Sequence, residues 1–203
     1  MFMSDMSLNE NLSSTPQDRR ELMDLVERMQ GAFTTIAKSK IPTIALAHGF
    51  CIGGATSLVS ACDIRLATKD AKFSIGETKL GLVADVGVIQ RMPKIVSSGD
   101  MNELALTGRI FDGEHAEKIR FVSKVYENSD ELFEAGEMLA NEISSNSKRI
   151  VQATKEALEK SSNLTVDQGL EYAKLWSTSF LVSEDLREGV MAFLEKRDPK
   201  FNE

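Results

Sequence analysis

A glycine-rich turn between short apolar runs constrains the fold of this chain more than any other feature. Residues 43–47 (TIALA) are apolar and partly β-branched, which predicts a buried strand. Residues 48–55 (HGFCIGGA) predict a turn, and residues 56–62 are small and apolar, as in a short buried helix. Residues 63–67 and 72–75 predict two further strands. Strand, turn, helix and strand in this order predict an α/β fold.

Helical patterns flank this region. Thr15 can cap a helix that begins at Pro16 and ends near Lys40. Its apolar residues recur at spacings of three and four, which predicts a stripe facing the core. From Ser129 onward nearly all of the chain shows helical periodicity. The sequence therefore predicts an α/β core followed by a helical region that begins near residue 129.

Composition and charge exclude several classes of protein. The chain has 203 residues, of which 42% are hydrophobic, and these values fit one domain or a domain with a helical appendage. A net charge of -7 without a basic block disfavours binding to nucleic acids or anionic membranes. No apolar run is long enough to span a bilayer, and no signal peptide is evident. The two cysteines, Cys51 and Cys62, have no metal-type spacing, so we expect a soluble protein of a reducing compartment.

Two groups of residues are candidates for chemistry. Gly53 and Gly54 lie between a strand and a helix, where backbone amides can approach and stabilise a negative charge. Glu77 and Asp85 lie among apolar residues and glycines, where a carboxylate tends to have a raised pKa and can transfer protons. Each group also has a simpler interpretation, a tight turn for the glycines and surface charges for the carboxylates.

Other candidates are weaker. His48 and His115 are too few and too far apart in the sequence for a metal site. Ser57 lies in an apolar helix, but the residues before it do not form the G-x-S-x-G turn of a serine nucleophile. We therefore expect no metal site and no serine nucleophile.

Several motifs in order along the chain resemble those of the crotonase, or enoyl-CoA hydratase/isomerase, superfamily. Residues 40–55 (KIPTIALAHGFCIGGA) resemble its signature K-P-x-I-A-A-x-x-G-x-x-x-G-G-G. Residues 61–65 (ACDIR) and 106–109 (LTGR) resemble two later motifs. Residues 184–197 resemble its closing helix, D-x-x-E-G-x-x-A-F-x-E-K-R. Residues 81–94 (GLVADVGVIQRMPK) are most similar to the dienoyl-CoA isomerases within this family.

The resemblance implies a spiral of ββα turns and a helical tail that assembles trimers. It divides the chain into a truncated crotonase-like core, residues 1–128, and a helical oligomerisation region, residues 129–203. It also implies an acyl-CoA substrate, whose thioester oxygen two backbone amides hold while acidic side chains move protons. One amide falls on Gly54. The other falls on Met6, in a segment (FMSDMSL) that departs from the family pattern F-x-S-G-x-D-L.

The acidic positions leave three interpretations of function open. The family carboxylates fall on Glu77 and Asp85, and Ser57 stands where hydratases carry a glutamate. An enoyl-CoA isomerase of the dienoyl-CoA isomerase type would use Asp85 to remove a proton and Glu77 to return or orient one. Efficient hydration becomes doubtful, because it normally needs two carboxylates around one water. The alternatives are a hydratase-like enzyme and a catalytically impaired acyl-CoA-binding paralogue.

The resemblance also supplies expectations about binding and assembly. Substrate contacts fall on Ala45, Ala47, Gly49, Ile52, Gly53, Ser57 and Lys196. Lys38 and Lys40 are further candidates for the phosphates of CoA, and Lys196 with Arg197 has a simpler interpretation as solvated surface charge. We expect no cofactor apart from the CoA of the substrate, a homotrimer or dimer of trimers, and a cytoplasmic, mitochondrial or peroxisomal location.

Overall fold

The computed structural model describes residues 15–201, which form two compact units. The first unit holds the described residues up to Ser39 together with Thr43–Glu134. The second holds Lys40–Pro42 and the chain from Ala135 onward. The division predicted after residue 128 stays a prediction.

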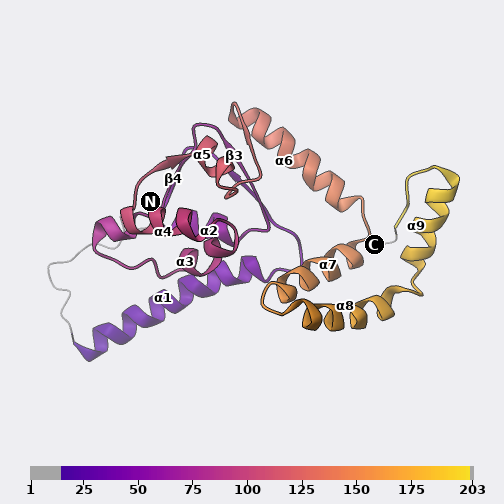
Figure 1. Ribbon diagram of the computed structural model, residues 1–203, viewed down its shortest axis with the longest axis horizontal. Helices are drawn as coiled ribbons and strands as arrows, with labels where there is room; N and C mark the ends of the chain where they lie inside the picture. The colour runs from indigo at the N-terminus through magenta and orange to yellow at the C-terminus, as the bar shows by residue number, and fades with distance from the viewer. Residues whose placement is uncertain (1–14, 202–203) are drawn as a thin grey trace. The chain divides into compact units, whose positions relative to one another are not determined.

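Helix α1 (Pro16–Ala37) begins with the predicted cap. The Thr15 hydroxyl accepts a hydrogen bond from the Asp18 amide, and the Asp18 carboxylate accepts one from the Thr15 amide. The predicted apolar stripe packs less deeply than expected, because none of the helix's side chains is fully buried. The reason is its position on the outside of the first unit, in contact with α2 (Figure 1).

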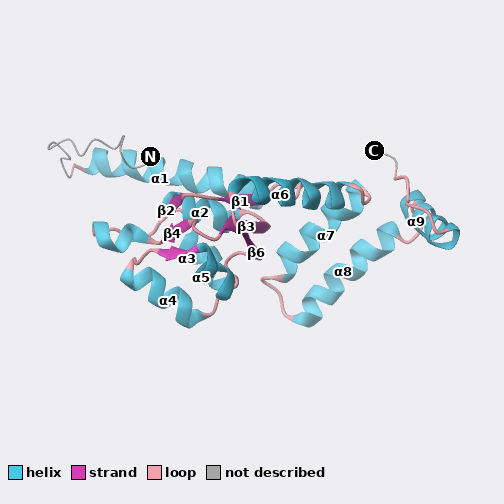
Figure 2. Cartoon of the chain, turned by 90° about the horizontal axis from the view of Figure 1, so that it is seen from above, coloured by secondary structure: helices cyan, strands magenta, loops and turns pink. Residues whose placement is uncertain are grey.

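Two three-stranded sheets form the centre of the first unit (Figure 2). One sheet consists of three parallel strands, β1 (Ile44–Ala47), β3 (Ile64–Thr68) and β6 (Lys124–Tyr126). The other consists of β2 (Phe50–Ile52), β4 (Lys72–Ser74) and β5 (Phe111–Asp112), with β2 parallel and β5 antiparallel to β4. Along the chain, β1 and β2 belong to different sheets, and so do β3 and β4. This alternation between the two sheets is the ββα pattern that the family resemblance implies.

Strand β2 corrects the sequence analysis, which predicted a glycine-rich turn over residues 48–55 and no strand within it. Gly49 has a φ of 64°, a left-handed conformation that lets the chain leave β1 and enter β2 at once. The three residues of β2 then pair with β4, about twenty residues further along the chain. This pairing is a long-range contact, so local sequence patterns did not reveal it.

Short helices connect the strands and cover the sheets. They are α2 (Gly54–Ala61), the 3₁₀ helix η1 (Gly76–Leu80), α3 (Val88–Arg91), the 3₁₀ helix η2 (Met92–Lys94), α4 (Ser98–Thr107) and α5 (Gly113–Lys118). The core beneath them includes the rings of Phe73, Phe111 and Phe121. Phe73 is fully buried and lies 5.5 Å from each of the other two ring centroids. Aromatic contacts of this kind add to the stabilisation from apolar burial.

The second unit is helical, as predicted from Ser129 onward. Helix α6 (Ser129–Ser144) leads into it, followed by α7 (Lys148–Ser161), α8 (Val166–Phe180) and α9 (Glu184–Glu195). Hydroxyl side chains cap three of these helices, at Ser147, Thr165 and Ser183. Helices α7 and α8 pack against each other. None of the described helices is both long and apolar enough to cross a membrane.

Candidate active site

The glycine pair lies where β2 turns into α2. Gly53 has a φ of 58°, and its amide donates a hydrogen bond to the Ser74 carbonyl at 2.9 Å. Gly54 is the first residue of α2, so its amide has no acceptor within the helix. Within residues 15–201 the Gly54 amide forms no hydrogen bond. A free amide at a helix N-terminus is suited to hold a developing negative charge.

Glu77 lies against this glycine turn. It stands on η1, and its Oε1 is 3.3 Å from the point that a Cβ atom on Gly53 would occupy. Its Oε2 is buried and has no hydrogen-bond partner among the described residues. The turn therefore carries a free amide on Gly54 and, beside it, a carboxylate with one uncommitted oxygen.

Ser57 lies one turn further along α2 and is fully buried. Its amide donates to the Gly53 carbonyl at 3.0 Å, and its hydroxyl oxygen has no partner among the described residues. A hydroxyl at neutral pH does not act as the carboxylate acid or base that hydratases of the resembled family carry here. The position supports the interpretation that Ser57 is not the proton-transferring group.

Asp85 lies in the loop between η1 and α3 and is exposed. Its carboxylate forms no hydrogen bond or ion pair with the described residues. The start of the loop is tied to Glu77, because the Leu82 amide donates to the Glu77 carbonyl at 3.0 Å. Both predicted carboxylates therefore belong to one connected segment of the first unit.

The remaining predicted contacts are distributed over both units. Ala45 and the buried Ala47 lie on β1, while Gly49, just before β2, and Ile52, its last residue, are exposed. Met6 lies outside the described residues. Lys196 ends α9 in the second unit and is exposed, so its predicted contact with CoA stays a prediction.

Arg197 corrects the interpretation of this residue as an ordinary solvated cation. Its Nη1 lies 2.6 Å from Glu188 Oε1, and its Nε donates to Glu195 Oε2 at 2.6 Å. The guanidinium, just beyond the end of α9, is thus held by two carboxylates of that helix.

Three residues around the Asp85 loop were missed by the sequence analysis. The Gln30 side-chain amide donates to the Asp85 carbonyl at 2.6 Å. Arg91 Nη1 donates to the Val86 carbonyl at 3.3 Å, and Nη2 donates to the Thr34 hydroxyl at 3.1 Å. The only signal in the sequence was the spacing of Gln30 and Thr34, which places two polar residues on one face of α1 beside the apolar stripe.

The ACDIR motif has a structural role here. The Asp63 carboxylate accepts hydrogen bonds from the Thr43 amide at 2.7 Å and from the Thr43 hydroxyl at 2.9 Å. Arg65 donates to the Phe121 carbonyl at 2.7 Å, and burial lowers the pKa of its guanidinium. These bonds hold the ends of β1 and β3 in place and fix the segment that leads into β6.

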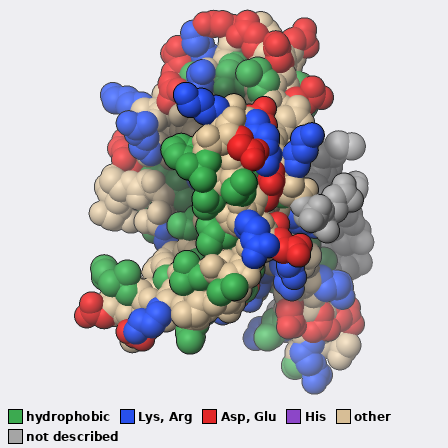
Figure 3. All heavy atoms as spheres, turned by 90° about the vertical axis from the view of Figure 1, so that its right-hand side faces the viewer, with side chains coloured by type: hydrophobic (Ala, Val, Ile, Leu, Met, Phe, Trp, Pro, Cys, Tyr) green, Lys and Arg blue, Asp and Glu red, His purple; other side chains and the backbone are tan. Residues whose placement is uncertain are grey.

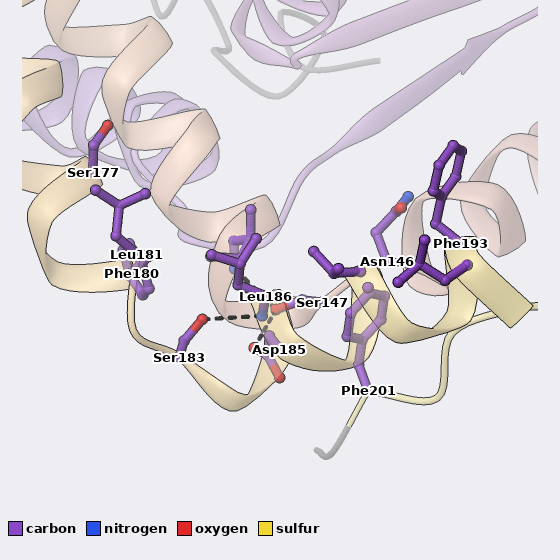
Figure 4. Close-up of a pocket in the computed structure, with 14 residues that line it drawn as sticks. Asn146, Ser147, Ser177, Phe180, Leu181, Ser183, Asp185, Leu186, Phe193 and Phe201 are labelled. Atoms are coloured by element: carbon purple, nitrogen blue, oxygen red, sulfur yellow. Dashed lines mark hydrogen bonds between the residues drawn. The ribbon is translucent and has the colours of Figure 1, made fainter.

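The second unit has a hollow of its own, with a volume of about 560 Å³ (Figure 4). Its walls are mostly apolar and come from α7, α8, α9 and the last described residues. The Ser147 hydroxyl donates to Asp185 Oδ2 at 2.6 Å on its polar side. Among residues 15–201, no group of three or more His, Cys, Asp or Glu side chains could hold a metal ion. The glycine turn with Glu77 is therefore the stronger candidate for chemistry.

Comparison with known proteins identifies the family of the chain. The model of the family described as enoyl-CoA hydratase/isomerase matches residues 2–203. The chain belongs to this family. Its fold is that of the crotonases: an enoyl-CoA hydratase from Bacillus anthracis superposes with a TM-score of 0.86 at 27% identity, over 97% of this chain and 74% of that one. An enoyl-CoA hydratase from Polaromonas gives a TM-score of 0.84 at 26% identity, over 92% of this chain and 74% of that one.

Several curated relatives in the family carry the name Delta(3,5)-Delta(2,4)-dienoyl-CoA isomerase. The mitochondrial protein of Dictyostelium discoideum is 46% identical over 93% of this chain and 64% of its own length. The peroxisomal protein of Arabidopsis thaliana is 42% identical over 93% of this chain and 69% of its own length. The mitochondrial protein of Mus musculus is 43% identical over 88% of this chain and 55% of its own length. The chain thus spans 55–69% of the length of these three relatives.

Proposed function

We propose that this family member is an enoyl-CoA isomerase of the dienoyl-CoA isomerase type. The observation that carries the proposal is the glycine turn. The amide of Gly54 is free there, and the Glu77 carboxylate lies against the preceding residue, Gly53. The names of the relatives that are 42–46% identical support the same chemistry.

The proposed reaction is a proton transfer through an enolate. The Gly54 amide donates a hydrogen bond to the thioester oxygen, which lowers the energy of the negative charge that develops there. Asp85 removes a proton from one carbon of the acyl chain, Glu77 in its acid form gives a proton to another carbon, and proton exchange with solvent returns both carboxyls to their starting states. The double bonds shift, and no water is consumed. The scheme needs no cofactor besides the CoA that is part of the substrate. Lys196 is a candidate contact for the phosphates of this CoA.

Hydration is disfavoured by the environment of Ser57. A hydratase of this type needs a second carboxylate to orient the water, and the buried hydroxyl of Ser57 cannot replace it. We therefore expect conversion of 3,5-dienoyl-CoA or 3-enoyl-CoA to outpace hydration of 2-enoyl-CoA.

Replacing the proposed base tests the scheme. Asp85→Asn keeps the shape of the side chain but removes its basicity, so isomerase turnover should fall at least about 100-fold. Ser57→Ala is the matched comparison and should lower turnover less than about tenfold. The measurement is the rate of conjugated dienoyl-CoA formation by ultraviolet absorbance. Unchanged turnover of Asp85→Asn, or hydration faster than isomerisation in the unmodified protein, would overturn the proposal.

A further inference from the structure

The loop that carries Asp85 is held from one side by helix α1. The Gln30 side-chain amide reaches across to the Asp85 carbonyl, with a donor to acceptor distance of 2.6 Å. The two residues are 55 positions apart in the sequence. This hydrogen bond restrains the peptide unit of the proposed base itself.

Arg91 makes a second connection between the same elements. Its Nη1 donates to the Val86 carbonyl, next to Asp85, and its Nη2 donates to the Thr34 hydroxyl on α1. The guanidinium is partly buried, and within residues 15–201 it forms no ion pair. A planar group with several fixed donors is suited to bridge a loop and a helix.

Gly87 makes room for this bridge. Its φ is 115°, and a Cβ atom at this position would lie 1.9 Å from Arg91 Nη1. Gln30 and Thr34 are four residues apart, so both project from one face of α1. Two side-chain donors thus hold the loop at the adjacent carbonyls of Asp85 and Val86. Helix α1 carries one donor, Gln30, and orients the other, Arg91, through Thr34.

We propose that Gln30, Thr34 and Arg91 are positioning residues that hold Asp85 in the geometry needed for proton removal. This inference rests on the proposed role of Asp85 as the base. Proton transfer needs the base within hydrogen-bonding reach of the carbon acid, and a small displacement of a reacting group lowers the rate steeply. The three side chains act through the loop backbone and do not contact the substrate in this scheme.

Two substitutions on α1 test the proposal. Gln30→Leu removes the donor to Asp85, and Thr34→Val removes the acceptor that orients Arg91. Each should lower kcat about tenfold, the effect of losing one hydrogen bond, while KM changes less than about twofold. Wild-type kcat in both variants would overturn the inference, as would a rise in KM without a fall in kcat.

The same helix offers matched controls. Gln17 donates to Glu21 at 2.9 Å and Thr35 donates to the Gly31 carbonyl at 2.9 Å, so both bond only within α1. Gln17→Leu and Thr35→Val should leave kcat unchanged. Amide hydrogen exchange over residues 83–88 should be faster in Gln30→Leu and Thr34→Val than in the controls. This measurement reports how tightly the loop is held, independently of enzyme turnover. Equal exchange in all four variants would overturn the inference.

A double variant separates this inference from the proposed function. If Gln30 acts only through Asp85, Gln30→Leu should cause no further loss of turnover in the Asp85→Asn protein. An additional tenfold loss there would overturn the positioning role and leave Asp85 as the base. Wild-type turnover of Asp85→Asn alone would instead overturn the proposed function, whatever the exchange measurements show.

Discussion

Gly113 is a residue where neighbouring backbone atoms leave no room for a side chain. A Cβ atom there would lie 2.0 Å from the Thr68 carbonyl oxygen and 2.9 Å from the Lys69 carbonyl oxygen. The Gly113 amide also donates to Lys69 at 3.0 Å, so the two segments cannot separate without losing this bond. Gly113→Ala should lower the free energy of unfolding by about 2–3 kcal/mol, measured by urea denaturation.

Gly31 provides the control for this substitution. It lies within α1, and no atom is within 4 Å of the point where its Cβ would stand. Gly31→Ala should raise the free energy of unfolding by about 0.5–1 kcal/mol, because alanine loses less conformational entropy in a helix. Equal stability of the two alanine variants would show that the contact of Gly113 with β3 is not close.

Helix α9 and the segment that follows it are joined by one carboxylate. Glu188 accepts two hydrogen bonds from Arg197, at 2.6 and 3.1 Å, and one from the Lys200 amide at 2.7 Å. The Arg197 guanidinium, with a further contribution from the Lys200 amide, lowers the pKa of Glu188 from 4.5 to about 2. The folded protein therefore binds this proton at lower pH than the unfolded chain does.

The shift predicts how stability depends on pH. The contribution of Glu188 is fully present above its ordinary pKa and is lost as the pH falls towards about 2. The difference in unfolding free energy between the unmodified protein and Glu188→Gln should be constant from about pH 7 to 5 and vanish near pH 2. Glu171→Gln, which removes an exposed pair with Lys174, should have little effect at pH 7. A difference in unfolding free energy between the unmodified protein and Glu188→Gln that does not change with pH would contradict the lowered pKa of Glu188.

At the scale of the whole molecule, the second unit exposes several large apolar side chains. Figure 3 shows hydrophobic side chains at the surface among charged ones. Val182 is 96% exposed, Phe193 83% and Leu194 69%. Apolar patches of this kind usually mark interfaces between proteins.

We expect the protein to self-associate through these residues, and family resemblance makes the trimer the expected assembly. Light scattering at micromolar concentrations measures the mass directly. Phe193→Glu places a charge on the exposed apolar face of α9 and should shift the protein towards smaller species. A monomer at every concentration in the unmodified protein would contradict the expectation.

The sequence by itself determined the first helix, the helical region after Ser129 and the family. The capping residue Thr15, the helical periodicity after Ser129 and the ordered crotonase motifs are local features, so they could be recognised without coordinates. The glycine pair and the two carboxylates were found in the same way, from residue type and spacing.

Only the tertiary structure decided how these candidates are arranged. Strand β2, the contact of Glu77 with Gly53 and the bonds from Gln30 and Arg91 all join segments that are far apart in the sequence. The partial burial of α1 also depends on which neighbours cover it. Hydrogen bonds and burial of this kind form only when the chain has folded, so no local pattern of residues could have specified them.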